Sequence, residues 1–336
     1  MTVKKVAIIA AAGAVLLAGA LTLSMTLITR NKIEVTATET SAQNETEQEE
    51  GGVKTLENME NMPLYFEDTE KLLLPLRNTM EALGGTVKWD TETKQTAISY
   101  RGRTLRVRSG ERDAVLNGYA VTLPDEPNMI NGCLYVDEEV ISAYYTGEVR
   151  FNHETKQVTL EMKDGTEPVV AVKELTADEE NGGYSVDVPV IVGLNDANYE
   201  KSLNDSLMQQ MQEYIAAFIA EENAADSLLQ VQVTTGFCTK DFLSILWEGT
   251  RDGMPVRFAK NFDLLGQKAV TLADMLTQTS LEAAQAGEDW TAEQFYLTAD
   301  GELILIGRNA EGGQTIEPLT AEQSIWRKKY KGIFTK

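Results

Sequence analysis

Residues 72–98 read LLLPLRNTMEALGGTVKWDTETKQTAI, and residues 134–160 repeat the same order of features as LYVDEEVISAYYTGEVRFNHETKQVTL. Aligning Glu92 with Glu154 needs no gap, since the offset is 154 − 92 = 62, and the letters ETKQ occur in both copies. An internal duplication indicates that one structural unit occurs twice. The sequence therefore predicts a first folded domain built from two related halves.

Each copy has the pattern of a short amphipathic helix followed by a β-hairpin. In the first copy Leu76, Met80 and Leu83 recur on one helical face, and the pair Gly84-Gly85 supplies the expected C-terminal cap. A turn at Asp90-Thr91 then separates two strand patterns. Further strand-like runs between the copies occupy 104–107 and 114–123.

Several short motifs accompany the two copies: Leu74-Pro75-Leu76-Arg77, Ala82-Leu83-Gly84-Gly85, Val87, Trp89-Asp90, Asn117-Gly118 and Asn131-Gly132 before Leu134-Tyr135-Val136. Over about 53–163 this layout resembles the copper amine oxidase N-terminal-like domain, a small α+β stalk module common on surface proteins of Gram-positive bacteria. The second copy departs from the family, because Asp137-Glu138-Glu139 stands where another Pro-Leu-Arg is expected.

The second half of the chain has the pattern of an α+β domain. One long helix followed by successive hairpins is typical of a helix packed on a mainly antiparallel sheet. A short helix is predicted from Thr271 and a closing hairpin around Asp300-Gly301. The predicted long helix is 198–222, with Leu203, Leu207, Met211, Tyr214 and Phe218 on one face, and the predicted strands are 184–192, 228–237, 242–247 and 256–264.

A second set of motifs lies in this half: Val188-Pro189-Val190-Ile191, Leu203-Asn204, Leu243-Ser244-Ile245, Asn261-Phe262-Asp263-Leu264-Leu265-Gly266, Leu272-Ala273-Asp274-Met275-Leu276 and Phe295-Tyr296-Leu297-Thr298-Ala299-Asp300-Gly301. Their order resembles the extracellular domain shared by anti-sigma-V factors and the N-terminal regions of some peptidoglycan deacetylases. Two features depart from that family: the segment between Leu276 and Phe295 is short, and its usual aromatic ending is replaced. Sigma-factor binding is not expected, since only about five residues precede the predicted membrane span.

The charge excludes one class of partner. The chain of 336 residues carries Lys+Arg 30 against Asp+Glu 52, which gives a formal net charge of -22. Such a charge repels nucleic-acid phosphates and attracts basic partners, so nucleic-acid binding is not expected.

An apolar run from Val6 to Ile28 contains no charged residue and is flanked by Lys5 and Arg30. About 23 residues are enough to cross a bilayer as a helix. We favour a transmembrane anchor, because apolar residues continue past Ala18-Gly19-Ala20, where a cleaved signal peptide would end. The expected location is the cell membrane, single-pass with the bulk of the chain extracytoplasmic, or secreted if the segment is cleaved.

The predicted organisation is two small α+β domains behind this segment. The acidic stretch 177–183 is expected to be a solvated linker rather than a calcium loop, because it lacks the alternating Asp/Asn register of such loops. The predicted boundaries are 1–5 cytoplasmic stub, 6–29 transmembrane anchor or signal peptide, 30–52 disordered acidic linker, 53–163 repeat domain, 164–183 linker, 184–320 second domain and 321–336 basic tail.

Few residues are candidates for chemistry. Copper would need several imidazoles, and His153, the single histidine, is expected to be an exposed turn residue. Asn198-Tyr199-Glu200 matches the short pattern around a quinone-forming tyrosine, but no copper ligands accompany it. Cys133 and Cys238 have no metal or redox spacing, and the sequence leaves open whether they pair. Arg77 is expected to pair with a carboxylate of its own domain.

An enzymatic role is not expected, and no catalytic, cofactor-binding or metal residue can be named. One imidazole cannot supply the Asp and His ligands of a deacetylase metal site. Glycoside hydrolysis by two carboxylates stays open, since 52 acidic residues offer many pairs.

The expected function is binding of cell-wall glycan, meaning peptidoglycan, or of a basic wall-active protein such as a lysozyme, through the second domain; the binding residues are unknown. The alternative is a structural or assembly role in the cell envelope with no specific soluble ligand. Residues 326–336, WRKKYKGIFTK, are basic and aromatic in an acidic protein. A solvated end or a last strand is favoured for them, and contact with teichoic acid or lipid headgroups is the alternative.

Overall fold

The computed structural model describes residues 52–318 except 57–60, 146, 163–164, 166, 178–182, 222–225, 280–281, 283–289 and 310–313. All described residues fall within one compact unit, Glu49–Lys336. The predicted anchor at 6–29, the acidic linker before Gly52 and the basic tail lie outside the described residues. Within the described ranges, no helix has both the length and the apolar character needed to span a membrane.

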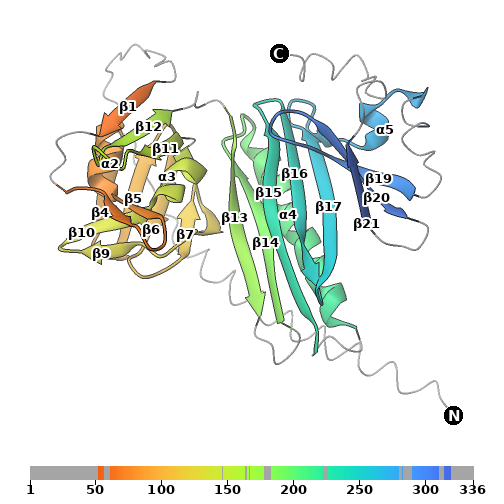
Figure 1. The fold of residues 1–336 in the computed structure, drawn as a ribbon, viewed down its shortest axis with the longest axis horizontal. Helices are drawn as coiled ribbons and strands as arrows, with labels where there is room; N and C mark the ends of the chain where they lie inside the picture. Colours follow the sequence, from red (N-terminus) through yellow and green to blue (C-terminus); the bar gives the residue numbers. More distant parts are fainter. Residues whose placement is uncertain are drawn as a thin grey trace. The chain divides into compact units, whose positions relative to one another are not determined.

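The predicted repeat region forms three sheets with two short helices, α2 (Leu76–Ala82) and α3 (Glu138–Tyr145) (Figure 1). The strand orders are β1-β12-β11, β2-β3-β10-β9 and β4-β5-β6-β7-β8. The strands are β1 Val53–Leu56, β2 Leu64–Phe66, β3 Lys71–Pro75, β4 Thr86–Asp90, β5 Gln95–Tyr100, β6 Arg103–Val107, β7 Asp113–Leu116, β8 Tyr119–Thr122, β9 Asn128–Ile130, β10 Cys133–Asp137, β11 Gly147–Phe151 and β12 Val158–Met162.

The two copies of the repeat meet in the sheet β2-β3-β10-β9. Strands β3 and β10 pair antiparallel, and Leu74 lies opposite Val136. These residues are equivalent in the repeat, because 136 − 74 = 62, and both are buried. When equivalent residues face each other in an antiparallel pair, a local two-fold axis passes between them. The two copies are therefore joined about an approximate two-fold axis in the buried centre of the region.

The hairpin turns repeat the same detail. Asp90 Oδ1 accepts hydrogen bonds from the backbone N–H groups of Glu92 and Thr93 at 2.9 and 3.1 Å. Asn152 Oδ1 accepts the equivalent pair in the second copy, both at 2.9 Å, and 152 − 90 = 62. A short Asx side chain that bonds the backbone two residues on is a standard turn device. The predicted hairpins are confirmed in both copies.

Both predicted repeat helices form. In α2, Leu76 and Met80 are buried, and the chain leaves the helix through Gly84 at φ 85°, a backbone conformation that glycine adopts without strain. Helix α3 begins without the Pro-Leu-Arg motif, because Asp137 Oδ1 accepts a hydrogen bond from the N–H of Glu139 at 3.0 Å. A side-chain acceptor thus replaces the proline as the start signal.

The second half contains a six-stranded sheet in the order β13-β14-β15-β16-β17-β18 and a three-stranded sheet β19-β20-β21. Helix α4 (Ala197–Ile219) connects β14 to β15, which pair in parallel, and lies across one face of the larger sheet (Figure 1). Helix α5 is Leu272–Met275. The strands are β13 Val169–Ala177, β14 Gly183–Val192, β15 Leu228–Cys238, β16 Phe242–Arg251, β17 Met254–Asp263, β18 Lys268–Ala269, β19 Trp290–Leu297, β20 Leu303–Asn309 and β21 Gln314–Pro318.

The predicted helix stripe is confirmed, with one addition. Four of its five residues are buried in the sheet core, Tyr214 is partly buried against Phe258, and Ile215 joins the buried set. Asp196 caps the helix by accepting from the N–H groups of Asn198 and Tyr199.

One segment differs from expectation. Strand β13 occupies residues of the range 164–183, for which the sequence predicts a linker. Its polar residues, including Lys173 and Glu174, mask the strand pattern, but Val169 and Ala171 alternate into the core and its full length pairs with β14. One hydrophobic cluster contains Val169 and Ala171 of β13 together with the repeat core residues Leu105 and Tyr145. The fold is therefore α+β, with β13 built into both halves.

The turn of the first hairpin yields a test by pH. Hydrogen bonds from Thr93, then from the Glu92 backbone, hold the pKa of Asp90 below its ordinary value. A lowered folded-state pKa contributes stability above the ordinary carboxyl pKa, and this stability is lost as pH falls through the lowered value. We expect Asp90→Asn to keep both hydrogen bonds and to remove this acid-dependent part of the free energy of unfolding, measured by urea unfolding from about pH 6 to about pH 2.

The second copy supplies the matched control. Asn152→Asp introduces a titrating group at the equivalent turn, so the free energy of unfolding should acquire an acid-dependent part instead of losing one. A stability difference between Asp90→Asn and the parent protein that stays constant across pH would contradict the interpretation.

Candidate functional site

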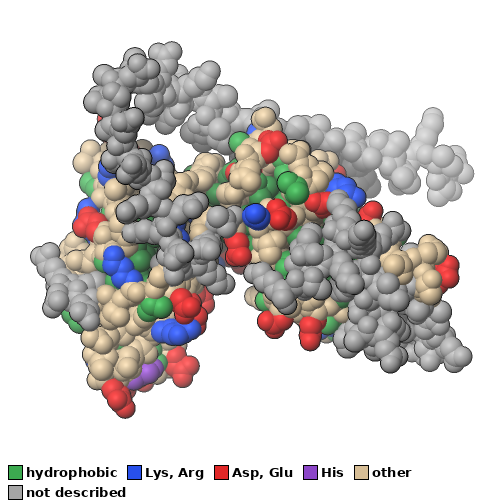
Figure 2. Space-filling view, turned by 90° about the horizontal axis from the view of Figure 1, so that it is seen from above, with side chains coloured by type: hydrophobic (Ala, Val, Ile, Leu, Met, Phe, Trp, Pro, Cys, Tyr) green, Lys and Arg blue, Asp and Glu red, His purple; other side chains and the backbone are tan. Residues whose placement is uncertain are grey.

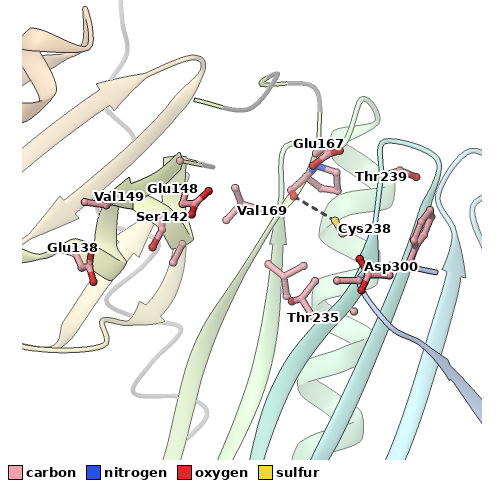
Figure 3. Close-up of a pocket in the computed structure, with 17 residues that line it drawn as sticks. Glu138, Ser142, Glu148, Val149, Glu167, Val169, Thr235, Cys238, Thr239 and Asp300 are labelled. Carbon is pink, nitrogen blue, oxygen red and sulfur yellow. Dashed lines mark hydrogen bonds between the residues drawn. The ribbon is translucent and has the colours of Figure 1, made fainter. Parts of the chain in front are cut away.

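An open cleft of about 900 Å³ lies between α3 and β11 on one wall and β13, β15 and the β19–β20 turn on the other (Figure 3). Its size is within the range of ligand-binding clefts. The lining residues are Glu138, Ser142, Ala143, Gly147, Glu148, Val149, Glu167, Pro168, Val169, Val170, Thr235, Gly236, Phe237, Cys238, Thr239, Ala299 and Asp300.

Helix α3 presents its polar face to the cleft. The helix buries Val140, Ile141 and Tyr144 in the repeat core. Glu138 and Ser142, spaced four apart, lie together on a different face and line the cleft, as expected for one turn of an α-helix.

The opposite wall is built where β15 comes close to β19. Gly236 of β15 lies so near β19 that a Cβ atom there would stand 1.9 Å from the Leu297 carbonyl oxygen, and therefore only glycine fits. This approach brings the β19–β20 turn, with Asp300, to the cleft. The Cys238 thiol donates to the Pro168 carbonyl at 3.7 Å (Figure 3).

A buried arginine, Arg103, holds the lining segment Glu167-Pro168 in place. Arg103 of β6 is 4% exposed, and its Nη2 donates to the Glu167 carbonyl at 2.7 Å. Burial lowers the pKa of Arg103, the direction expected when desolvation disfavours a charged group. Strand β13, which follows this segment, is also held to the repeats, because Thr122 Oγ1 accepts from the Glu174 N–H at 3.1 Å.

The cleft is acidic. Among the described lining residues four are carboxylates, and none is Lys or Arg. Arg150 lies next to one of them, Glu148, and pairs with both of its oxygens at 2.9 and 3.0 Å. Desolvation raises the pKa of Glu138, and the charges of Asp137 and Glu139 raise it further. The charge of a cation in the cleft would stabilise the ionised carboxylate and so oppose both effects.

The acidic surface continues past the cleft. A smaller hollow of about 320 Å³ shares Glu138 with it and contains four further carboxylates, one of them Asp125, which is paired with Lys71. These four are Glu70, Asp125, Asp137 and Glu139. Figure 2 shows acidic side chains on the visible face of the molecule. A ligand longer than one side chain therefore meets several carboxylates in succession.

Two strand edges border the cleft. β11 is the outer strand of β1-β12-β11, and β13 is the outer strand of the six-stranded sheet. In the ranges that the structure describes, no strand pairs with the outer side of either. The repeats cover part of the outer side of β13, because β8 and α3 pack against it and Thr122 Oγ1 accepts from the Glu174 N–H there. The cleft thus lies between the outer strands of two sheets and carries negative charge.

The residues that sequence reasoning singled out lie elsewhere. His153 is exposed in the second hairpin turn, as predicted, with its ring against Tyr65 and Phe151 at 4.8 and 5.1 Å between centroids. Figure 2 shows it at the surface. Arg77 pairs with Glu81 at 3.2 Å, which confirms the expected ion pair.

The remaining candidates have structural surroundings. Asn198-Tyr199-Glu200 forms the first turn of α4, where Glu200 accepts hydrogen bonds from the N–H groups of Gly193 and Leu194. No disulfide joins Cys133 and Cys238. Across the described part of the chain, no group of three or more His, Cys, Asp or Glu residues is placed to hold a metal ion.

The cleft residues were missed because they come from distant segments, but the repeat contains one signal. Glu138 and Ser142 occupy the positions of Leu76 and Met80, since 138 − 76 = 62 and 142 − 80 = 62. Both residues are buried in the first copy. When polar residues replace a buried apolar pair at equivalent positions of a duplicated helix, that side of the second helix is expected to face solvent or a polar site instead of the core.

Residues 53–191 match the family model of the copper amine oxidase N-terminal domain. The matched domain is non-catalytic. A protein of Brevibacillus choshinensis named "Protease inhibitor" is 27% identical over 108 residues, 32% of this chain and 33% of its own length. The "Primary amine oxidase" of Klebsiella aerogenes is 26% identical over 80 residues, 24% of this chain and 11% of its own. The chain therefore covers only a minor part of either relative.

Solved structures of the DUF3298 family are structural neighbours. The protein from Bacteroides fragilis is 12% identical with a TM-score of 0.34, covering 55% of this chain and 96% of that one. The protein from Pseudomonas aeruginosa is 12% identical with a TM-score of 0.31, covering 48% and 93%.

The buried arginine gives a test of how the cleft is assembled. We expect Arg103→Met to lower the free energy of unfolding by about 1.5–3 kcal/mol, the usual contribution of a charge-assisted hydrogen bond, and to speed amide exchange at Glu167, Val169 and Val170. The control is Arg101→Met, which removes a partly exposed guanidinium that stacks over Tyr100 at 5.2 Å. Equal losses in the two variants would show that Arg103 has no special role in holding the cleft wall.

Proposed function

We propose that the cleft binds a cationic segment of another protein, and that the chain is a membrane-anchored cell-surface binding protein with no catalytic role. The observation that supports this best is a cleft with four carboxylates and no basic residue among its described lining. Opposite charge supplies long-range attraction, and the carboxylates accept directional hydrogen bonds from Lys and Arg side chains.

The proposed partner is a basic wall-active protein such as a lysozyme. The net charge of -22 raises the encounter rate with any basic protein, and the cleft concentrates part of that charge at one place. The predicted anchor puts the chain where such proteins act. The resemblance of the second half to the extracellular domain of anti-sigma-V factors agrees with a sensor-like domain outside the membrane.

A protein partner fits the name of one relative better than a glycan does. The Brevibacillus choshinensis relative is named "Protease inhibitor", a description of a protein that acts on another protein. Peptidoglycan binding and a purely structural role in the envelope remain the competing functions, and each predicts a different experimental outcome.

The test uses the full-length protein in detergent and a purified basic lysozyme as the probe. We expect the triple variant Glu138→Gln, Glu167→Gln and Asp300→Asn to weaken binding by about tenfold or more, since each 1.4 kcal/mol corresponds to about tenfold in Kd. Binding of the parent protein should also weaken as salt rises from about 50 to about 300 mM, because screening shortens the range of the attraction. Calorimetry measures both effects.

The matched control removes the same three charges from exposed turns of the repeat region, through Asp68→Asn, Glu92→Gln and Glu154→Gln. Its effect should stay within about twofold, because only the overall field changes. Equal losses in the two triple variants would mean that the cleft is not the site. No binding of the lysozyme probe, with salt-insensitive retention on purified peptidoglycan, would favour the glycan; no binding to either would favour the structural role.

A further inference from the structure

One stretch of this acidic chain is strongly basic. Residues 326–336 contain Arg327, Lys328, Lys329, Lys331 and Lys336, and neither Asp nor Glu. Its charge is therefore opposite to that of the cleft. The same stretch contains Trp326, Tyr330 and Phe334, and the cleft lining includes Val149, Val170 and Phe237 between its carboxylates.

The last described strand ends on the side of the sheet where the cleft lies. β21 runs antiparallel to β20 and ends at Pro318, opposite Ile304. β20 begins at Leu303, directly after the turn that carries Asp300 into the cleft lining. The chain thus leaves the described sheet close to one of the cleft's carboxylates.

The connecting length is sufficient. Paired strand residues lie about 5 Å apart, and the four residues from Ile304 to Asp300 span at most about 14 Å. Pro318 is therefore within about 19 Å of Asp300. The eight residues from Pro318 to Trp326 reach about 26 Å when extended. The basic stretch can enter the cleft without any rearrangement of the sheet.

We propose that residues 326–336 of this chain bind in the acidic cleft as an intramolecular ligand and compete there with the external basic partner. A short tether raises the effective concentration of a linked ligand to about the millimolar range, so weak contacts are enough for high occupancy. The apparent affinity for an external partner falls by the fraction of clefts that remain open. Binding of residues 326–336 in the cleft does not depend on the proposed function. Competition with an external basic partner does rest on it.

Occupancy is tested by a disulfide trap that needs no external partner. Cys238 lines the cleft, so in a full-length Cys133→Ser background a second thiol is introduced by Phe334→Cys. Mild oxidation should join residues 238 and 334 within one molecule, as identified by peptide mapping. Neutralising the stretch through Arg327→Gln, Lys328→Gln, Lys329→Gln and Lys331→Gln should reduce the yield several-fold. An equal yield in the neutralised variant, or no intramolecular disulfide at all, would overturn the proposal.

Competition is tested by measuring lysozyme binding to the full-length protein that carries the same four neutralising substitutions in 326–336 but no engineered thiol. We expect affinity to rise several-fold over the parent protein. The matched control neutralises four exposed basic residues of the repeat region, Lys54, Lys88, Lys94 and Arg106, and changes the net charge equally. A rise of the same size in the control, or no rise, would overturn competition. A disulfide that forms while lysozyme fails to bind would leave the intramolecular ligand standing and refute the proposed function.

Discussion

The docking of β13 is the constraint on which the rest of the described structure depends. One side of this strand pairs with β14, while β8 and α3 of the repeats cover it from the other half of the chain. Several polar contacts fix the arrangement, among them Arg103 to the Glu167 carbonyl, Thr122 to the Glu174 N–H, and Lys173 to Asp113 at 2.7 Å. The cleft begins at Val169 and Val170, near the start of the strand.

The duplication explains why, of the two described repeat helices, α3 lines the cleft and α2 does not. Both copies form the same strand, helix and hairpin, so their packing onto each other is close to symmetric. The symmetry is broken by the neighbour, because the second half of the chain packs beside α3. Where the first copy buries Leu76, the second places Glu138 at the cleft. Divergence at one end of one helix was sufficient to turn a core position into a charged wall.

The helices and hairpins could be predicted from the sequence, but the residues that line the cleft could not. The two hairpins and the stripe of α4 depend on residues close in sequence, so their spacing predicted them. Strand β13 was missed because Lys173 and Glu174 interrupt its apolar alternation, and only the packed structure shows which side each residue faces. The cleft joins Glu138, Glu167 and Asp300, whose meeting depends on tertiary packing that periodicity does not describe.

The negative charge of the cleft affects two kinds of contact. An outer strand such as β11 is a template for pairing with an extended segment, including the same strand of a second copy. Carboxylates beside the strand oppose that pairing, because a second copy brings the same negative cleft and the same net charge of -22. The same charges attract a segment rich in Lys and Arg. The charge on which the proposed binding depends is therefore also a charge that opposes pairing between two copies.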